Sequence, residues 1–160
     1  MESKEKRDAR FVEALRAHRQ SMYRVAFSMT RSAADAEDAV SQATLNAYEA
    51  AGRVRDWGAI KAYLLRVTVN ACHDILRKRK KEQAADTDAL LRDRAAVEET
   101  PVWMYTQQLP LKLRLVLEMR YGEGLGLQDI AGILRVPRGT VSSRLSRAQD
   151  LLKQLMEKEG

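Results

Sequence analysis

Two short amphipathic helices with a tight break between them are predicted near the C-terminal end of the sequence. Each helix has apolar residues at helical spacing, so each has one face to bury. Pro137 lies between them; it lacks a backbone N–H and has a fixed φ, so it ends the first helix and suits the opening of the second. The pattern predicts a helix-turn-helix with its break between Leu134 and Arg138. The buried positions are expected to be Ile130, Ala131, Leu134, Val141, Leu145 and Ala148.

The outward face of the second predicted helix is basic and rich in hydroxyl groups. Residues 138–149 contain three arginines and no acid. Guanidinium groups can bind phosphates or guanine edges, and short hydroxyl side chains allow close approach to a DNA backbone. The pattern therefore favours a DNA-binding helix over the solvated face of an ordinary helical hairpin. The candidate contact residues are Arg138, Thr140, Ser142, Ser143, Arg144 and Arg147.

Three longer helices are predicted in the N-terminal part, over residues 8–30, 32–51 and 59–80. Ser32 or Asp35 can cap the second helix, and Gly52 is expected to stop it. Apolar positions at helical spacing give each helix a core face. These positions are Phe11, Val12, Leu15, Met22, Val25, Ala26 and Met29 in the first, Ala36, Val40, Ala43 and Ala47 in the second, and Ile60, Leu64, Val67, Ala71 and Ile75 in the third.

The second of these helices has an acidic surface. No Lys or Arg occurs between Arg31 and Arg53. Acids near its start, such as Asp35 and Asp38, could simply complement the positive end of the helix dipole. Because acids would be repelled by DNA, the functional interpretation is a docking face for a basic protein surface.

The third helix has a basic edge that also carries an amide. Arg66, Asn70, His73 and Arg77 follow one another at spacings of four, three and four, opposite the apolar stripe. Asn can pair with a base edge, and the basic run over residues 77–81 can bind phosphates. Nearby aromatic residues can stack on exposed bases. The alternative is a solvated helix face with a basic tail and core aromatics.

Charge and composition divide the chain into two parts. The formal net charge is +6, and residues 61–81 alone carry a net +6, whereas residues 82–100 carry a net −4. Because residues 82–102 are also poor in large apolar side chains, we expect a flexible acidic linker there. With Gly and Pro scarce, the sequence predicts an all-α fold of two small helical domains, residues 8–81 and 103–157, joined by this linker.

The sequence contains little that suggests a metal site, a cofactor or an enzyme. The only soft metal ligands or nucleophiles are His18, Cys72 and His73; the last two are neighbours that point to different helix faces. Cys72 is expected to be a small core residue. No apolar run approaches the roughly 20 residues of a membrane span, and the N-terminus is charged, so a cytoplasmic protein without membrane insertion is expected.

Three segments together resemble the extracytoplasmic-function group of bacterial sigma factors, in the sigma-70 family. Residues 35–48 resemble region 2.2, residues 62–80 resemble regions 2.3 and 2.4, and residues 109–121 with the helix-turn-helix resemble region 4. Their order and spacing match the family over about residues 11–155. The resemblance implies a non-enzymatic transcription initiation factor whose partners are core RNA polymerase, promoter DNA and an anti-sigma factor, with no small-molecule substrate.

The resemblance also implies a role for each surface. The helix-turn-helix residues named above would read the minus-35 element. The residues expected to bind core polymerase are Asp35, Asp38, Gln42, Leu45, Tyr48 and Glu49. The residues expected to bind the minus-10 element are Trp57, Tyr63, Arg66, Asn70, His73, Arg77 and Lys78.

The chain departs from the family pattern at five positions. Gln42 replaces an acid, Thr44 a bulky aromatic residue and Tyr63 a Trp. Gly126 stands where a capping Ser is common, and Arg135 where Gly is usual, which would cost about 1 kcal/mol in a left-handed conformation.

A different class of DNA-binding protein, an autonomous helix-turn-helix regulator, would bind duplex DNA alone as a symmetric dimer. The sequence shows no heptad seam for such a dimer. Its last leucines, Leu151, Leu152 and Leu155, are more simply explained as core.

Overall fold

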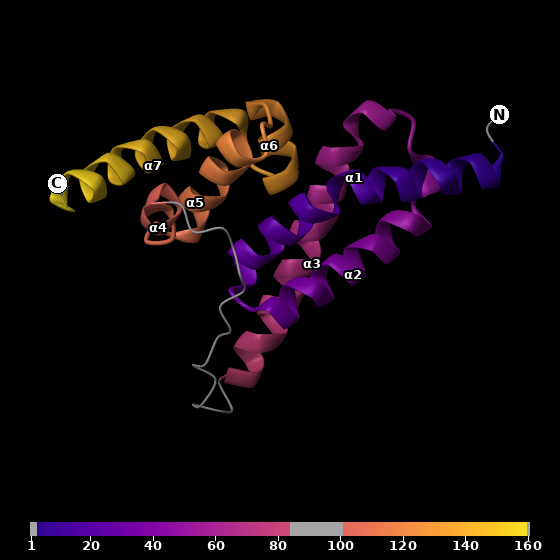
Figure 1. The fold of residues 1–160 in the computed structure, drawn as a ribbon, viewed down its shortest axis with the longest axis horizontal. Coiled ribbons are helices and arrows are strands. Elements are labelled where there is room, and N and C mark those ends of the chain that lie inside the picture. The colour runs from indigo at the N-terminus through magenta and orange to yellow at the C-terminus, as the bar shows by residue number, and fades with distance from the viewer. Residues whose placement is uncertain (1–2, 84–100, 160) are drawn as a thin grey trace. The chain divides into compact units, whose positions relative to one another are not determined.

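A computed structural model describes residues 3–83 and 101–159 of the 160-residue chain, and every regular element in these ranges is helical (Figure 1). The chain divides into two compact units, Met1–Ala95 and Ala96–Gly160. The all-α prediction is confirmed. Most of the predicted acidic linker, over residues 82–102, lies outside the described residues.

Three long helices form the first unit, and each packs against the other two. They are α1 (Lys4–Thr30), α2 (Ala33–Glu49) and α3 (Ile60–Gln83); two short 3₁₀ turns, η1 (Ala51–Arg53) and η2 (Trp57–Ala59), join α2 to α3. Alanines line the buried face of α2, which lets neighbouring helices approach closely. The largest fully buried side chains of this unit are Met22, Val25, Leu64, Leu65, Thr68, Val69 and Cys72.

Local capping explains where α1 and α2 begin. The Ser3 side chain accepts a hydrogen bond from the Lys6 N–H at 3.3 Å, so α1 starts four residues before the predicted position. Arg31 ends α1 in a left-handed conformation with φ 56°, and its N–H bonds to the Phe27 carbonyl. Ser32 then caps α2 by accepting from the Asp35 N–H at 3.3 Å, which confirms Ser32 as one of the two predicted caps.

Three details of the predicted helices are wrong. The α2 helix ends at Glu49, because the chain tightens into η1 and Gly52 does not serve as its stop. Val12 is 47% exposed, since it lies one residue past the buried Phe11 and therefore turns away from the core. Leu15, Val67 and Ile75 are only half-buried; on α3 the buried face is displaced from the predicted stripe toward Leu65, Thr68 and Cys72.

The second unit is built around its last helix. It comprises α4 (Pro101–Thr106), α5 (Leu111–Leu117), a π-helical turn η3 (Glu118–Gly122), α6 (Leu127–Leu134) and α7 (Arg138–Glu159). The α7 helix packs against α4, α5 and α6. Arg114 is buried on α5, where its Nη1 donates to the Leu109 carbonyl at 3.1 Å and its Nε lies 4.0 Å from Glu118 Oε1.

The helix-turn-helix lies where the pattern predicts it. Arg135 ends α6 in a left-handed conformation with φ 56°, and its N–H bonds to the Ala131 carbonyl. Gly126 stands at the N-cap of α6 and offers no side-chain cap. Ile130, Val141 and Ala148 are fully buried and Leu145 is buried, whereas Ala131 and Leu134 are half-buried. No helix in the described part of the chain is long and apolar enough to span a membrane.

Candidate functional site

One face of α2 combines acids, an amide and an exposed leucine. Asp38, Gln42 and Glu49 are all exposed. Leu45 is 59% exposed between Gln42 and Glu49, so it adds apolar area to this otherwise polar face. The Gln42 Nε2 donates to Asn46 Oδ1 at 3.1 Å, one turn further along the same face.

Tyr48 extends this face, although it is partly held by α1. Its ring packs edge-on against Phe11, with centroids 5.6 Å apart, and its hydroxyl donates to Asp8 Oδ2 at 3.3 Å. The side chain remains 43% exposed. The position of Tyr48 on the surface is therefore set by the first turns of α1.

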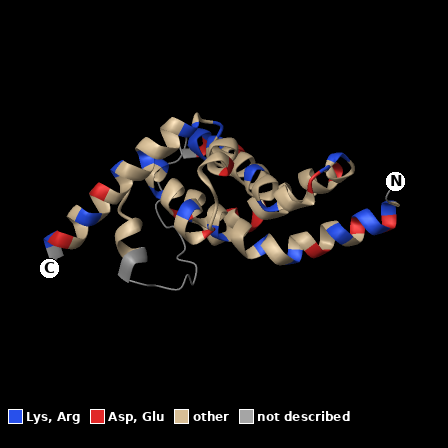
Figure 2. Ribbon diagram, turned by 90° about the horizontal axis from the view of Figure 1, so that it is seen from above, with Lys and Arg blue, Asp and Glu red and all other residues tan. Residues whose placement is uncertain are grey.

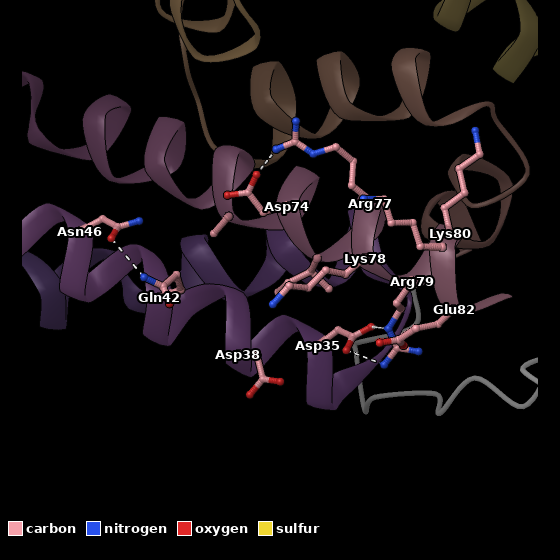
Figure 3. Close-up of a pocket in the computed structure, with 13 residues that line it drawn as sticks. Asp35, Asp38, Gln42, Asn46, Asp74, Arg77, Lys78, Arg79, Lys80 and Glu82 are labelled. Atoms are coloured by element: carbon pink, nitrogen blue, oxygen red, sulfur yellow. Dashed lines mark hydrogen bonds and ion pairs between the residues drawn. The ribbon is translucent and has the colours of Figure 1, made fainter. Parts of the chain in front are cut away.

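Asp35 does not belong to the exposed face of α2. It lies one turn before Ala39 on the buried side, with its side chain only 8% exposed. The Arg79 guanidinium from the end of α3 donates to Asp35 Oδ1 through Nη2 and pairs with Oδ2 through Nε (Figure 3). The sequence prediction placed Asp35 on the docking surface, but the structure uses it to join α2 to α3. By contrast, Asp38 points away from this pair (Figure 3).

A groove of about 1130 Å³ runs between α2 and the C-terminal half of α3. Its α2 wall includes Asp38 and Gln42, and its α3 wall includes Lys78 and the exposed pair of Asp74 with Arg77 (Figure 3). The groove therefore has acidic and amide groups on the α2 side and mostly basic groups, with Asp74 and Glu82 among them, on the α3 side. Lys78, predicted as a DNA contact, borders this groove.

The predicted basic edge of α3 is accessible along its length. Arg66, His73 and Arg77 are exposed. Asn70, which lies between Arg66 and His73 in the sequence, is half-buried. Arg77 pairs with Asp74 on the same helix, with both side chains at least 67% exposed, so the pair can open to admit another partner. Because α3 is a continuous helix over Ile60–Gln83, the spacing of four, three and four residues places these side chains along one helix face.

The two aromatic residues expected near the minus-10 element are each half-buried. Tyr63 lies in the first turn of α3. Trp57 opens η2, where Asp56 Oδ1 accepts from the Gly58 N–H at 2.9 Å and fixes the turn. The Arg10 guanidinium of α1 lies over the indole, 5.8 Å from the ring centroid. One face of Trp57 is thus already covered by a cation.

The first turns of α7 present the predicted hydroxyl and arginine groups. Arg138, Ser142, Ser143 and Arg147 are exposed, whereas Thr140 and Arg144 are half-buried. The N–H groups of Thr140 and Val141 both bond to the Pro137 carbonyl, at 3.0 and 3.3 Å. Pro137 therefore anchors the start of the helix whose polar face lies outward.

Cys72 is buried in α3 and remains a core residue. Burial, with a smaller contribution from the charge of Asp35, raises the pKa of its thiol to about 12. No group of three or more His, Cys, Asp and Glu side chains that could hold a metal ion occurs in the part of the chain that the structure describes.

Sequence reasoning missed three residues that hold these surfaces, Arg79, Asp8 and Arg10, whereas Phe11 was predicted as a core residue and is buried. The sequence analysis counted Arg79 only as part of the basic run over residues 77–81. Its ion-pair partner, Asp35, lies 44 residues earlier in the chain. The signal that could have found the pair is the position of Asp35, which shares a helix face with the alanines of the core.

Comparisons with known proteins assign both units. Residues 14–82 match the Sigma-70 region 2 family, and residues 107–154 match the Sigma-70, region 4 family. The chain is 33% identical to the ECF RNA polymerase sigma factor SigM of Mycobacterium tuberculosis, over 91% of this chain and 76% of that protein. It is 29% identical to the RNA polymerase sigma factor SigV of Bacillus subtilis, over 99% of this chain and 98% of that protein.

A solved structure shares the fold. The sigma factor RpoE of Bartonella quintana, crystallised in complex with the anti-sigma factor NepR, aligns with a TM-score of 0.79 and 21% identity, over 92% of this chain and 96% of that one. Since both sigma-70 regions are matched in order and the relatives align over most of their length, the chain belongs to the ECF group of RNA polymerase sigma factors in the sigma-70 family.

Proposed function

We propose that this alternative sigma factor uses three separate surfaces to bind core RNA polymerase and direct initiation at specific promoters. The observation that carries the proposal is the exposed face of α2, where acids surround a leucine that is 59% exposed and no Lys or Arg occurs between Arg31 and Arg53. Such a face suits a basic protein partner and would repel DNA.

The core-polymerase-binding surface consists of the exposed α2 residues. Leu45 and Tyr48 supply apolar area, and acids on either side supply charge complementarity to a basic partner. Asp35 is left out because its carboxylate is buried against Arg79. The proposed residues are Asp38, Gln42, Leu45, Tyr48 and Glu49.

The α3 surface would bind the minus-10 element. Asn70 can pair with a base edge, Arg66 and Arg77 can bind phosphates, and Trp57 or Tyr63 can hold an unpaired base by stacking. Binding of unpaired bases would supply the free energy that opens the duplex. His73 lies between Asn70 and Arg77 on this surface, and Lys78 borders it at the groove.

The first turns of α7 would enter the major groove at the minus-35 element. Arg138, Arg147 and the serines between them are exposed and Arg144 is half-buried, on a helix that buries Val141, Leu145 and Ala148 on its other side; this arrangement suits a recognition helix. The residues are Arg138, Thr140, Ser142, Ser143, Arg144 and Arg147.

The chain is proposed to act in the cytoplasm, where polymerase and promoter DNA are found, and to be held inactive by an anti-sigma factor. Two structures that share its fold support the second point. One is RpoE with the anti-sigma factor NepR, and the other is CnrH with the cytosolic domain of CnrY, at a TM-score of 0.67 and 20% identity.

A charge reversal on α2 tests whether its exposed acidic face binds core polymerase. Asp38→Lys should weaken binding to core polymerase about tenfold, because it places a cation where a basic surface is expected to dock. Gel filtration with core polymerase, followed by run-off transcription on a pool of genomic promoter fragments, measures binding and initiation together. Glu13→Lys makes the same reversal at an exposed position of α1 and should leave both unchanged.

Unchanged affinity of Asp38→Lys would overturn the docking assignment. Tight binding to duplex DNA by the wild-type protein, with no association with core polymerase, would instead point to an autonomous regulator.

A further inference from the structure

The first turns of α1 contact the end of α2 and the connection that leads from α2 to α3. This part of α1, residues 4–11, precedes the region-2 match, which begins at residue 14. Basic and acidic residues are interspersed along it, as the blue and red parts of the ribbon at the end marked N in Figure 2 show. Asp8 and Phe11 hold Tyr48 at the end of α2, as described above.

The connection itself is touched at two further points. A Cβ placed on Gly52 would lie 3.4 Å from Arg7 Nη1, so this guanidinium lies directly against η1. Arg10, about one turn later on α1, covers the ring of Trp57 in η2 at 5.8 Å. Arg7 therefore contacts η1, and Arg10 contacts η2.

The connection has little packing of its own. Of residues 50–59, only Ala51 is buried; Gly52, Arg53, Arg55, Asp56, Gly58 and Ala59 are exposed. A segment with so few buried side chains takes its conformation from neighbouring elements. Asp56 fixes the η2 backbone, and the Arg10 guanidinium lies over the indole.

We propose that Arg10 is a positioning residue for Trp57. By lying over one face of the indole, its guanidinium holds the ring in place before promoter DNA arrives, so that less conformational entropy is lost when an unpaired base stacks on the aromatic surface. The inference rests on the proposed role of Trp57 at the minus-10 element. It extends the promoter-opening surface to a part of α1 outside the region-2 match.

The free protein offers a first test that needs no DNA. The chain has two tryptophans, so Trp103→Phe leaves Trp57 as the single reporter. In that background, Arg10→Ala should increase acrylamide quenching of Trp57 fluorescence, because one face of the ring loses its cover. Arg19→Ala removes the same charge from an exposed position of α1 and should leave quenching unchanged. Equal quenching in the two variants would overturn the proposed contact.

A double-mutant cycle in the holoenzyme tests the function. On a promoter identified by the run-off assay, Arg10→Ala should reduce open-complex formation about two- to fivefold, the range for an exposed cation–π contact. Affinity for core polymerase should not change. In a Trp57→Ala background the same substitution should have no further effect, because Arg10 acts through the ring it holds.

The two possible failures are distinguishable. If Trp57→Ala leaves open-complex formation unchanged, the promoter role of Trp57 is wrong. If Trp57→Ala reduces it but Arg10→Ala does not, or if the two losses multiply in the double variant, Trp57 keeps its role and Arg10 does not act by positioning it.

Discussion

The Cys72 side chain has no exposed surface in α3, and its environment favours the neutral thiol. The pKa of the folded thiol is about 12, because of burial first and the charge of Asp35 second, against an ordinary value of 9.0. The unfolded chain therefore releases the thiol proton at a lower pH than the folded chain does. The contribution of Cys72 to stability is complete below pH 9 and is lost as the pH rises from 9 toward 12.

This linkage predicts a steeper alkaline loss of stability in the wild type than in Cys72→Ala. Between pH 8 and pH 10 the free energy of unfolding of the wild type should fall by about 1 kcal/mol more than that of the variant, because the unfolded chain releases the thiol proton in this range and the folded chain keeps it. Urea denaturation followed by circular dichroism at the two pH values measures the difference. Parallel pH dependences in the two proteins would contradict the linkage.

Arg135 carries the clearest backbone strain in the second unit. Its φ of 56° is in the left-handed region, which costs a residue with a Cβ about 1–2 kcal/mol. Arg135→Gly should stabilise this unit by about 0.5–1 kcal/mol, the remainder being offset by the greater freedom of glycine in the unfolded chain. Thermal unfolding of the wild type and of Arg135→Gly measures this gain in stability. Arg135→Ala keeps the Cβ and is expected to give no gain; an equal gain there would mean that strain is not the cause.

At the scale of elements, α2 and α3 are joined by the ion pair between Asp35 and Arg79. The Asp35 side chain is 8% exposed, so removing its partner leaves a buried carboxylate without a counter-charge. Arg79→Ala should therefore lower the free energy of unfolding by about 2–3 kcal/mol, less than for a fully buried pair because Arg79 is itself 44% exposed.

A second Arg–Asp pair on α3 provides the control. Arg77 and Asp74 have side chains 75% and 67% exposed, so Arg77→Ala should change the free energy of unfolding by no more than about 0.5 kcal/mol. Urea unfolding of both variants gives the comparison. Equal effects at Arg77 and Arg79 would show that burial of Asp35 does not determine the strength of the pair.

The elements that the sequence predicts well are those set by local chemistry. The helix-turn-helix follows from two apolar stripes and Pro137, and the start of α2 follows from the hydroxyl of Ser32. At Arg135 the sequence indicated only what a left-handed conformation would cost, since Gly is usual there, whereas the same conformation at Arg31 was not foreseen.

What the sequence could not predict depends on contacts between distant segments. A buried Asp35 and an exposed Asp38 are both acids near one helix start, and only the fold brings Arg79 to the first of them. The contact of Arg10 with Trp57 likewise depends on how α1 crosses the α2–α3 connection. Periodicity assigns a residue to a helix face but does not say which neighbour covers that face.

At the scale of the whole molecule, the proposed DNA contacts are divided between the two units, so each can be tested against a separate promoter element. Arg144→Ala should reduce transcription about tenfold at a promoter with a minus-35 element, the loss expected for one base-reading arginine. Binding to core polymerase should be unchanged, because the proposed docking face belongs to the other unit.

The matched control is Lys153→Ala, which removes an exposed charge about two and a half turns further along α7 and should keep full activity. Run-off transcription on templates with and without the minus-35 element measures the difference. Equal loss of activity on both templates would contradict the assignment of α7 to this element.

The early start of α1 at Lys4 has a consequence for domain exchange between sigma factors. The recognisable region 2 begins only at residue 14, which invites a junction there when a promoter-reading module is moved to a new host protein. A graft cut at that boundary would leave Arg7, Asp8, Arg10 and Phe11 behind, together with their contacts to Tyr48, Gly52 and Trp57. The transplantable unit begins at the Ser3 cap, ahead of the first helical turn.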